Sequence, residues 1–192
     1  MKRIVLSLTL LAVTIVAMAQ EAPKSFEIKS GIAKINTTLM GQVAESTTYF
    51  DNYGAISVTK SKTSVPGSGE IEVSTITKDG KNYIVIPAMK QVREAPVNVE
   101  EVINYLQLTD EVREKFKIKE LGTETVCGKE CTKYSEEITQ QGQKASATVC
   151  VWKGFPMKTI IAFAGLEITT EVVEFTEDAF ILPQTFEIPS FE

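Results

Sequence analysis

The sequence contains no histidine among its 192 residues. Histidine is the usual general base beside a serine or cysteine nucleophile, and it is the commonest ligand of zinc and copper in proteins. Its absence leaves carboxylate chemistry and oxygen-ligated cations as the remaining catalytic routes. The sequence also lacks a glycine-rich phosphate loop, a GxSxG motif and the spacing of an EF-hand. We therefore expect a protein that is not an enzyme and that carries no cofactor.

The sequence is also poor in positive charge. It has 20 Lys and Arg residues against 25 Asp and Glu residues, for a net charge of −5 at pH 7. Nucleic-acid binding needs clustered Lys and Arg, and so does an electrostatic grip on anionic lipid headgroups. We expect no nucleic-acid partner.

The N-terminus has the layout of a secretory signal peptide. Lys2 and Arg3 precede an apolar run at residues 4–16, and residues 17–19 place small side chains at the two positions that signal peptidase reads. The run is too short to span a membrane. The residue after the expected cleavage site is Gln20 and not cysteine, so we expect no lipid anchor there.

These features predict the organisation of the chain. We expect residues 1–19 to be a cleaved signal peptide and residues 20–192 to form a single domain, because no repeat or linker interrupts them. The mature protein would not span a membrane. It would be periplasmic or secreted, after cleavage between Ala19 and Gln20, and would work in an oxidising compartment.

Most of the chain shows the alternation of apolar and polar residues that is typical of β-strands. The clearest case is a hairpin with Asp79 and Gly80 as its central turn residues. This turn pairs Lys78 with Lys81. Both faces of the hairpin are then apolar, with Ile71, Val73, Thr75, Ile84 and Ile86 on one face and Ser74, Ile76, Tyr83 and Val85 on the other. We expect the hairpin to be covered on both sides or to line a cavity.

Other strands are separated by turns rich in Gly, Asn and Ser. Residues 51–54 are predicted to be a turn between two strands, and residues 61–69 are predicted to be a loop. The tail at residues 181–189 contains proline, so it is predicted to be an edge strand or a segment clamped over the core. After Lys119, strands are predicted at residues 122–127, 131–139, 145–153, 157–164 and 167–175.

Two helices are predicted in the middle of the chain. Asn98 and Glu101 have capping-box spacing ahead of an apolar stripe, so the first helix is expected to run to about Leu106. Thr109 is expected to cap a second, short helix that contains Phe116.

The sequence contains three cysteines, so at most one disulfide can form within the chain, and one thiol then remains. If Gln141 and Gly142 turn a hairpin, Cys131 and Cys150 are diagonal neighbours on one face, and we favour a disulfide between them. In the alternative, a three-residue loop places Cys127 opposite Cys131. Three thiols without histidine do not complete a structural zinc site, so we expect no metal.

Few residues are candidates for a functional site. Tyr83 and Trp152, the single tryptophan, are candidate walls of a ligand cavity, with a packed core position as the alternative. Adjacent carboxylates occur at residues 100–101, 136–137 and 177–178. Neighbouring residues on a strand point to opposite faces, so solvated surface charge explains these pairs better than a catalytic dyad does.

Short segments resemble the periplasmic carriers that sort lipoproteins to the outer membrane, and uncharacterised exported proteins related to them. They are GKECTKY at residues 128–134, VWKGFP at residues 151–156, LP at residues 182–183 and FEIP at residues 186–189. In the first half, YFDNYG at residues 49–54 and the Asp79–Gly80 hairpin fall in the matching order.

The resemblance implies an α+β, mainly β fold. It implies a strongly curved antiparallel half-barrel sheet, with two or three short helices capping the concave face. It also implies a cavity that binds a lipid, an acyl chain or another hydrophobic ligand, with a role in envelope lipid or lipoprotein trafficking. The alternatives are an envelope protein-interaction or stress-sensing module with a self-filled cavity and a protein partner, and a carboxylate-dependent hydrolase.

Overall fold

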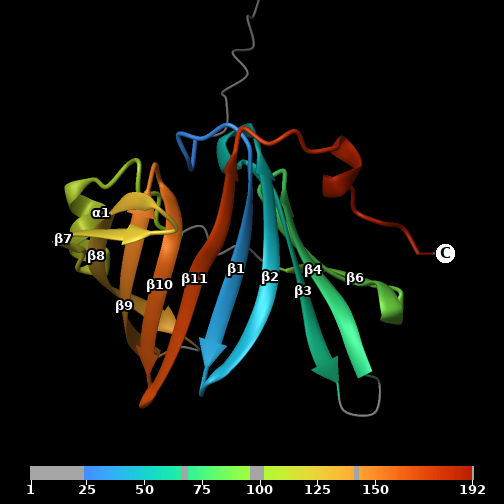
Figure 1. Ribbon diagram of the computed structural model, residues 1–192, viewed down its shortest axis with the longest axis horizontal. Coiled ribbons are helices and arrows are strands. Elements are labelled where there is room, and N and C mark those ends of the chain that lie inside the picture. The colour runs from blue at the N-terminus through green and yellow to red at the C-terminus, as the bar shows by residue number, and fades with distance from the viewer. Residues whose placement is uncertain (1–23, 66–68, 96–101, 141–142, 192) are drawn as a thin grey trace, which may run out of the picture.

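The computed structural model describes residues 24–65, 69–95, 102–140 and 143–191. Within these residues, 11 strands form one open antiparallel sheet in the order β6-β5-β4-β3-β2-β1-β11-β10-β9-β8-β7 (Figure 1). The sheet consists of two meanders, β1 to β6 and β7 to β11, which are joined where β1 pairs with β11. The fold is therefore mainly β, as predicted.

The bounds of the elements are as follows. The first meander contains β1 (Gly31–Leu39), β2 (Gln42–Asp51), β3 (Ile56–Val65), β4 (Gly69–Lys78), β5 (Lys81–Ile86) and β6 (Gln91–Ala95). The second contains β7 (Lys119–Val126), β8 (Lys129–Gln140), β9 (Gln143–Trp152), β10 (Phe155–Phe163) and β11 (Leu166–Glu177). The helical elements are α1 (Asp110–Phe116) and the 3₁₀ turns η1 (Asn52–Gly54), η2 (Pro87–Met89) and η4 (Pro183–Phe186).

The predicted hairpin is confirmed in its turn and in its register. Asp79 and Gly80 both have positive φ, at 52° and 70°, between β4 and β5. Lys78 pairs with Lys81 as expected. Two-residue turns of this kind match the right-handed twist of the strands that they join. The five strands predicted after Lys119 are also confirmed, as β7 to β11, with small shifts of their bounds.

Two predictions in the middle of the chain are wrong. Residues 61–65 continue β3 and are not a loop. Residues 102–106, the expected end of the first helix, hold a turn and no helix, and residues 98–101 lie outside the described part of the chain. Asn104 gives the physical reason: its side chain accepts a hydrogen bond from the Leu106 N–H at 3.0 Å and donates one to the Lys24 carbonyl at 2.9 Å. Such local bonds compete with helical ones.

The second predicted helix is confirmed as α1. The Thr109 hydroxyl accepts a hydrogen bond from the Val112 N–H at 3.3 Å, which caps the first turn. No helix in the described residues has the length and hydrophobicity needed to cross a membrane. The predicted signal peptide lies outside those residues.

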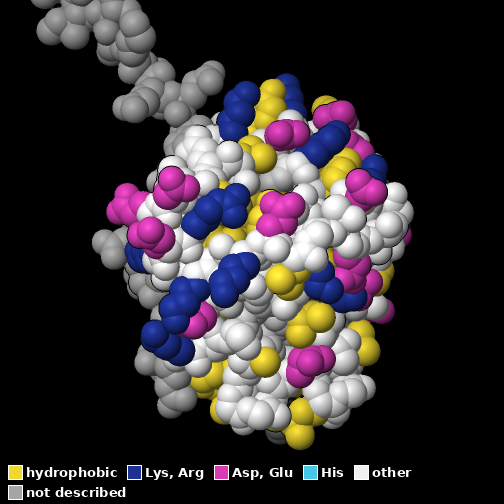
Figure 2. Space-filling model, turned by 90° about the vertical axis from the view of Figure 1, so that its left-hand side faces the viewer, with side chains coloured by type: hydrophobic (Ala, Val, Ile, Leu, Met, Phe, Trp, Pro, Cys, Tyr) yellow, Lys and Arg dark blue, Asp and Glu magenta, His cyan; other side chains and the backbone are white. Residues whose placement is uncertain are grey.

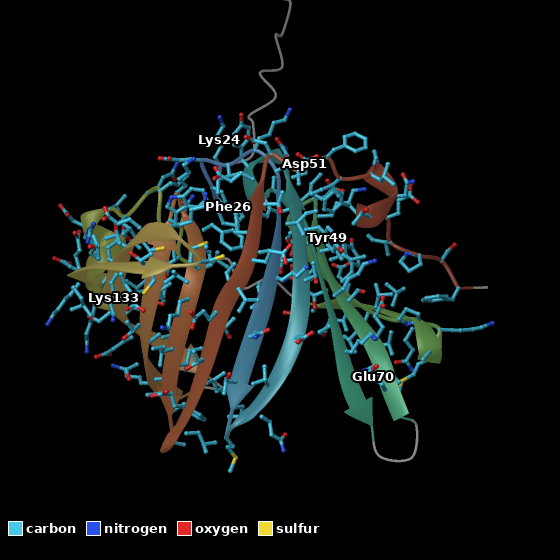
Figure 3. The ribbon with its side chains drawn as sticks, viewed as in Figure 1. Lys24, Phe26, Tyr49, Asp51, Glu70 and Lys133 are labelled. Atoms are coloured by element: carbon cyan, nitrogen blue, oxygen red, sulfur yellow. The ribbon has the colours of Figure 1, made fainter. Side chains whose placement is uncertain are left out.

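Aromatic rings pack around Phe50, which is fully buried. Phe26 meets it edge-on with ring centroids 5.0 Å apart, and Phe155 stacks on it at 5.3 Å. Figure 3 shows Phe26 near the end of the sheet at which Asp51 lies. A Cβ atom on Gly31 would come within 2.6 Å of the Phe50 ring, so glycine is required where this ring crosses the start of β1. We call Phe26, Phe50 and Phe155 the phenylalanine cluster.

The C-terminal tail packs onto the first meander. Phe186 of η4 is buried against Val58, Ile76 and Val85, a group that we call the tail cluster. The prediction of a segment clamped over the core is confirmed. The tail thereby covers one face of β3, β4 and β5.

Candidate ligand-binding face

The alternation of side chains along each strand gives the sheet two faces. We call the face under the C-terminal tail the tail face. On the opposite face the register places Thr37 opposite Thr170, Thr48 opposite Thr59, and Thr59 opposite Thr75. We call this second face the threonine face.

The hydroxyl row is our name for two pairs of threonine hydroxyls on this face, which are offset by four residues along the strands. The Oγ1 atoms of Thr48 and Thr59 are 2.8 Å apart, and those of Thr37 and Thr170 are 3.4 Å apart. In each pair one hydroxyl can donate to the other, so pairing satisfies one of the two O–H groups without water. The row is uncharged and half-buried.

The hairpin of β4 and β5 adds apolar side chains on one side of this row. Ile71 is buried, and Val73, Ile84 and Ile86 are half-buried. None of the four belongs to the three clusters of buried hydrophobic residues found in the described part of the chain. The hairpin is thus apolar on both faces, and the tail covers one of them.

Strands β8 and β9 add apolar side chains on the other side of the row. The pairing of Thr159 with both Thr170 and Val149 puts Val149 on the threonine face. Val149 is buried in a cluster that also contains Tyr134 and Tyr105, whose rings stack with centroids 5.8 Å apart. Tyr105 belongs to the segment before α1, so this segment covers one flank of the threonine face.

A buried carboxylate lies in the same flank. Glu136 is 7% exposed, and its Oε2 accepts a hydrogen bond from the Tyr105 hydroxyl at 2.8 Å. Burial raises the pKa of Glu136, although this hydrogen bond opposes the shift by favouring the ionised form. Burial, with the Glu136 charge, also raises the pKa of Tyr105. The prediction that residues 136–137 are solvated surface charge is wrong for Glu136.

The two residues predicted to line a cavity pack into two different hydrophobic clusters. Tyr83 pairs with Ile76 and packs against the tail cluster. Trp152 packs against the phenylalanine cluster and meets Phe175 edge-on at 5.6 Å. The ammonium groups of Lys129 and Lys153 lie 4.4 Å and 4.6 Å from the centroid of the Trp152 ring. A ligand contact by Tyr83 or Trp152 stays a prediction.

The cysteines are thiols in this structure. Lys133 pairs with Cys150 as predicted, so Cys131 and Cys150 are diagonal neighbours, and both are buried. Burial raises the pKa of the Cys150 thiol to about 11, which makes it a poor nucleophile at neutral pH. The alternative three-residue loop is wrong, because Cys127 and Gly128 form a two-residue turn and Cys131 pairs with Glu124. The disulfide between Cys131 and Cys150 stays a prediction.

Glu124 joins three strands through lysines. Its carboxylate accepts hydrogen bonds from Lys133 at 2.7 Å and from Lys158 at 3.0 Å. These two ammonium groups lower the pKa of Glu124 to about 2. Glu124 is therefore ionised throughout the physiological range, and it links β7, β8 and β10. No group of acidic and cysteine side chains within the described residues is arranged to hold a metal ion.

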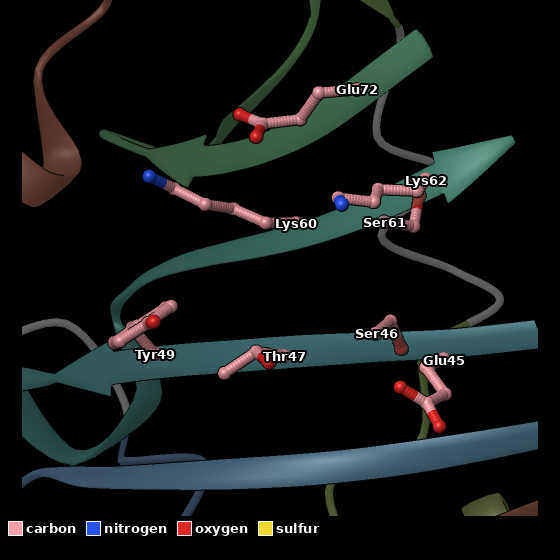
Figure 4. Close-up of a pocket in the computed structure, with 8 residues that line it drawn as sticks. All are labelled: Glu45, Ser46, Thr47, Tyr49, Lys60, Ser61, Lys62 and Glu72. Atoms are coloured by element: carbon pink, nitrogen blue, oxygen red, sulfur yellow. The ribbon is translucent and has the colours of Figure 1, made fainter. Parts of the chain in front are cut away.

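A small pocket lies on the tail face of β2, β3 and β4 (Figure 4). Its volume is about 300 Å³, and its lining includes the charged residues Glu45, Lys60, Lys62 and Glu72. This polar pocket differs in character from the apolar cavity that the resemblance implies.

Comparison with known proteins shows similarity in fold. No protein-family model matches the chain, and no curated protein matches it. An uncharacterized conserved protein from Thermus thermophilus is 12% identical, with a TM-score of 0.56, over 85% of this chain and 87% of that chain. MucB is 12% identical, with a TM-score of 0.52, over 84% of this chain and 57% of that chain. MucB is also seen in a MucA/MucB complex from Pseudomonas aeruginosa.

These similarities concern the fold, because the sequence identities are low. A putative outer membrane lipoprotein-sorting protein domain from Vibrio parahaemolyticus is 12% identical, with a TM-score of 0.37, over 82% of this chain and 89% of that chain. The chain shares its fold with the Thermus thermophilus protein and with part of MucB.

Proposed function

We propose that this protein is an exported, non-catalytic binding protein that holds a lipid, an acyl chain or another hydrophobic ligand against the threonine face. The hairpin of β4 and β5 carries the proposal, because it is apolar on both faces and the C-terminal tail covers one of them. Val73, Ile84 and Ile86 are half-buried on the other face. Burial of an acyl chain there supplies about 0.8 kcal/mol per CH₂, without any charge pairing.

We also propose a shape, a processing step, a location and a disulfide for the working protein. The sheet is a curved half-barrel whose concave side is the threonine face, flanked by the Tyr105 segment and α1. Residues 1–19 are removed, residues 20–192 act as a single domain in the periplasm or outside the cell, and the oxidising compartment joins Cys131 to Cys150. The paired hydroxyl groups on this face lower the cost of replacing water by an acyl chain, because one O–H group of each pair keeps its hydrogen bond.

A second candidate is an envelope protein-interaction module. The similarity in fold to MucB, which has been solved in complex with MucA, supports this candidate. In that case a protein segment, and not a lipid, lies against the threonine face.

Native mass spectrometry of residues 20–192, purified after gentle extraction, distinguishes the two candidates. We expect adducts of lipid mass on the wild type and at least a several-fold lower bound fraction for Ile84→Ser. Ile188→Ser is the matched control, because Ile188 lies in the tail and is 37% exposed. A wild type without adducts that also fails to take up a fluorescent fatty acid from solution would contradict lipid binding.

A further inference from the structure

Two neighbouring hairpin tips expose hydrophobic side chains at one end of the sheet. We propose that the tips joining β1 to β2 and β10 to β11 insert into the interface of a lipid bilayer, where the protein loads or releases its ligand. This inference rests on the proposed function, and it adds the part of the protein through which the ligand passes between the bilayer and the binding face.

The pairing of β1 with β11 brings the two tips together. Leu39, at the end of β1, lies opposite Ile168 of β11, and Leu166 of β11 lies opposite Phe163 of β10. Both turns contain two residues with positive φ, Met40 with Gly41 and Ala164 with Gly165. Figure 1 shows both tips at the end of the sheet away from the C-terminal tail.

The hydrophobic side chains of the two tips lie close together and are exposed to solvent, which is unusual for a group of hydrophobic residues. We call Leu39, Met40, Val43 and Leu166 the apolar rim; their side chains are 40%, 79%, 58% and 44% exposed. Single exposed hydrophobic residues are ordinary, but a group on adjacent tips marks a contact surface.

The charge around the tips favours a bilayer as the contact. Residues 35–44 and residues 159–166 contain no charged side chain, and the acidic residues Glu45 and Glu167 follow them directly. Figure 2 shows hydrophobic and uncharged side chains, with acidic side chains close by, at this lower end of the molecule, whereas Lys and Arg side chains lie higher up. Exposed apolar side chains on uncharged turns enter the boundary between headgroups and acyl chains at little cost, and the absence of lysine and arginine from the tips favours a neutral bilayer over an anionic one.

The apolar rim is continuous with the proposed ligand site. Leu39 and Leu166 lie on the threonine face, because they are spaced by even numbers of residues from Thr37 and Thr170. Ile161 and Ile168, which pair on the same face, lie between the tips and the hydroxyl row. A ligand leaving a bilayer at the tips therefore reaches the threonine face along apolar side chains.

Flotation with vesicles of pure phosphatidylcholine tests the inference. We expect the mature wild type to float with the vesicles and the double variant Met40→Glu/Val43→Glu, whose Val43 lies on the face opposite the threonine face, to bind at least ten-fold more weakly. Phe180→Glu is the matched control, because Phe180 is 87% exposed and lies beyond β11. We expect that control to bind within two-fold of the wild type. Far-UV circular dichroism and the urea midpoint verify the fold, and Met40→Gln provides a milder second variant.

Uptake of a fatty acid delivered in solution separates this inference from the proposed function. The double variant should take up the dissolved fatty acid as the wild type does, while failing to extract it from vesicles. Equal flotation of wild type and double variant would overturn membrane insertion, and so would binding that requires anionic phosphatidylglycerol or a protein in the vesicles. If the wild type floats but takes up no fatty acid in solution, the proposed function fails and insertion alone stands.

Discussion

The two faces of the β4–β5 hairpin differ in what lies on them, although their residues are of the same kind. Ile76 and Val85 on the tail face are each 3% exposed, because Phe186 packs over them. Ile84 and Ile86 on the threonine face are half-buried and belong to no cluster of the described residues. The comparison teaches that a segment distant in sequence decides which side of a strand stabilises the fold. Our proposal assigns the ligand to the other side.

The largest expected effect comes from removing the side chain that covers the tail face. Phe186→Ala should lower the free energy of unfolding by about 3 kcal/mol, because it leaves a cavity over three strands. Urea denaturation measures the change. Phe180→Ala, on a ring that is 87% exposed, should shift it by at most about 0.5 kcal/mol. Equal effects of the two variants would show that the tail does not stabilise the sheet.

A pair of matched isoleucines tests the comparison within one hairpin. Ile76→Ala should cost about 2–4 kcal/mol, because Ile76 is buried in the tail cluster. Ile84→Ala should cost about 1 kcal/mol, because its side chain is already partly exposed. Only Ile84→Ala should weaken fatty-acid uptake. Equal losses of stability would mean that both faces are closed to the same degree.

The sequence predicted the local features of this fold better than its long-range contacts. The Asp79–Gly80 turn and the Thr109 cap depend on neighbouring residues, and both are confirmed. Strand β1 was not predicted, because Lys34, Asn36, Thr37 and Thr38 give it little apolar alternation. The helix expected to run to Leu106 fails because the Asn104 side chain bonds the backbone locally.

The candidate site was harder to predict than the fold. The burial of Glu136 depends on Tyr105, which arrives from another segment, and nothing in the local sequence of β8 indicates it. Which face of the hairpin is covered depends on Phe186, near the other end of the chain. The lack of charge at residues 35–44 and 159–166 is a local feature, but it is the pairing of β1 with β11 that makes the two segments neighbours.

A smaller effect is expected from the buried carboxylate on the threonine face. Because burial raises the pKa of Glu136 in the folded state, its contribution to stability is full below its unfolded pKa and is lost as pH rises through the folded value. Glu136→Gln should therefore remove part of the loss of stability between pH 4 and pH 7. Urea midpoints across this range measure it, with Glu120→Gln as an exposed control. An unchanged pH profile would contradict the burial argument.

The smallest effect is expected at Glu124. Its pKa is lowered to about 2 by Lys133 and Lys158, so its contribution is present above its unfolded pKa and is lost as pH falls towards 2. Glu124→Gln should cost about 0.5 kcal/mol at pH 7, since the pairs are only partly buried, and less at pH 3. Urea denaturation at both pH values measures this; a greater loss at pH 3 would contradict it.

Photo-crosslinking with a diazirine-bearing fatty acid tests the central claim most directly. The mature protein is loaded in solution, irradiated and digested, and the labelled residues are located by mass spectrometry. We predict labels on residues of the threonine face, above all Val73, Ile84 and Ile86, and their loss in Ile84→Ser. Labels confined to the tail cluster or to the polar pocket, or no label above that of an unloaded control, would contradict the account.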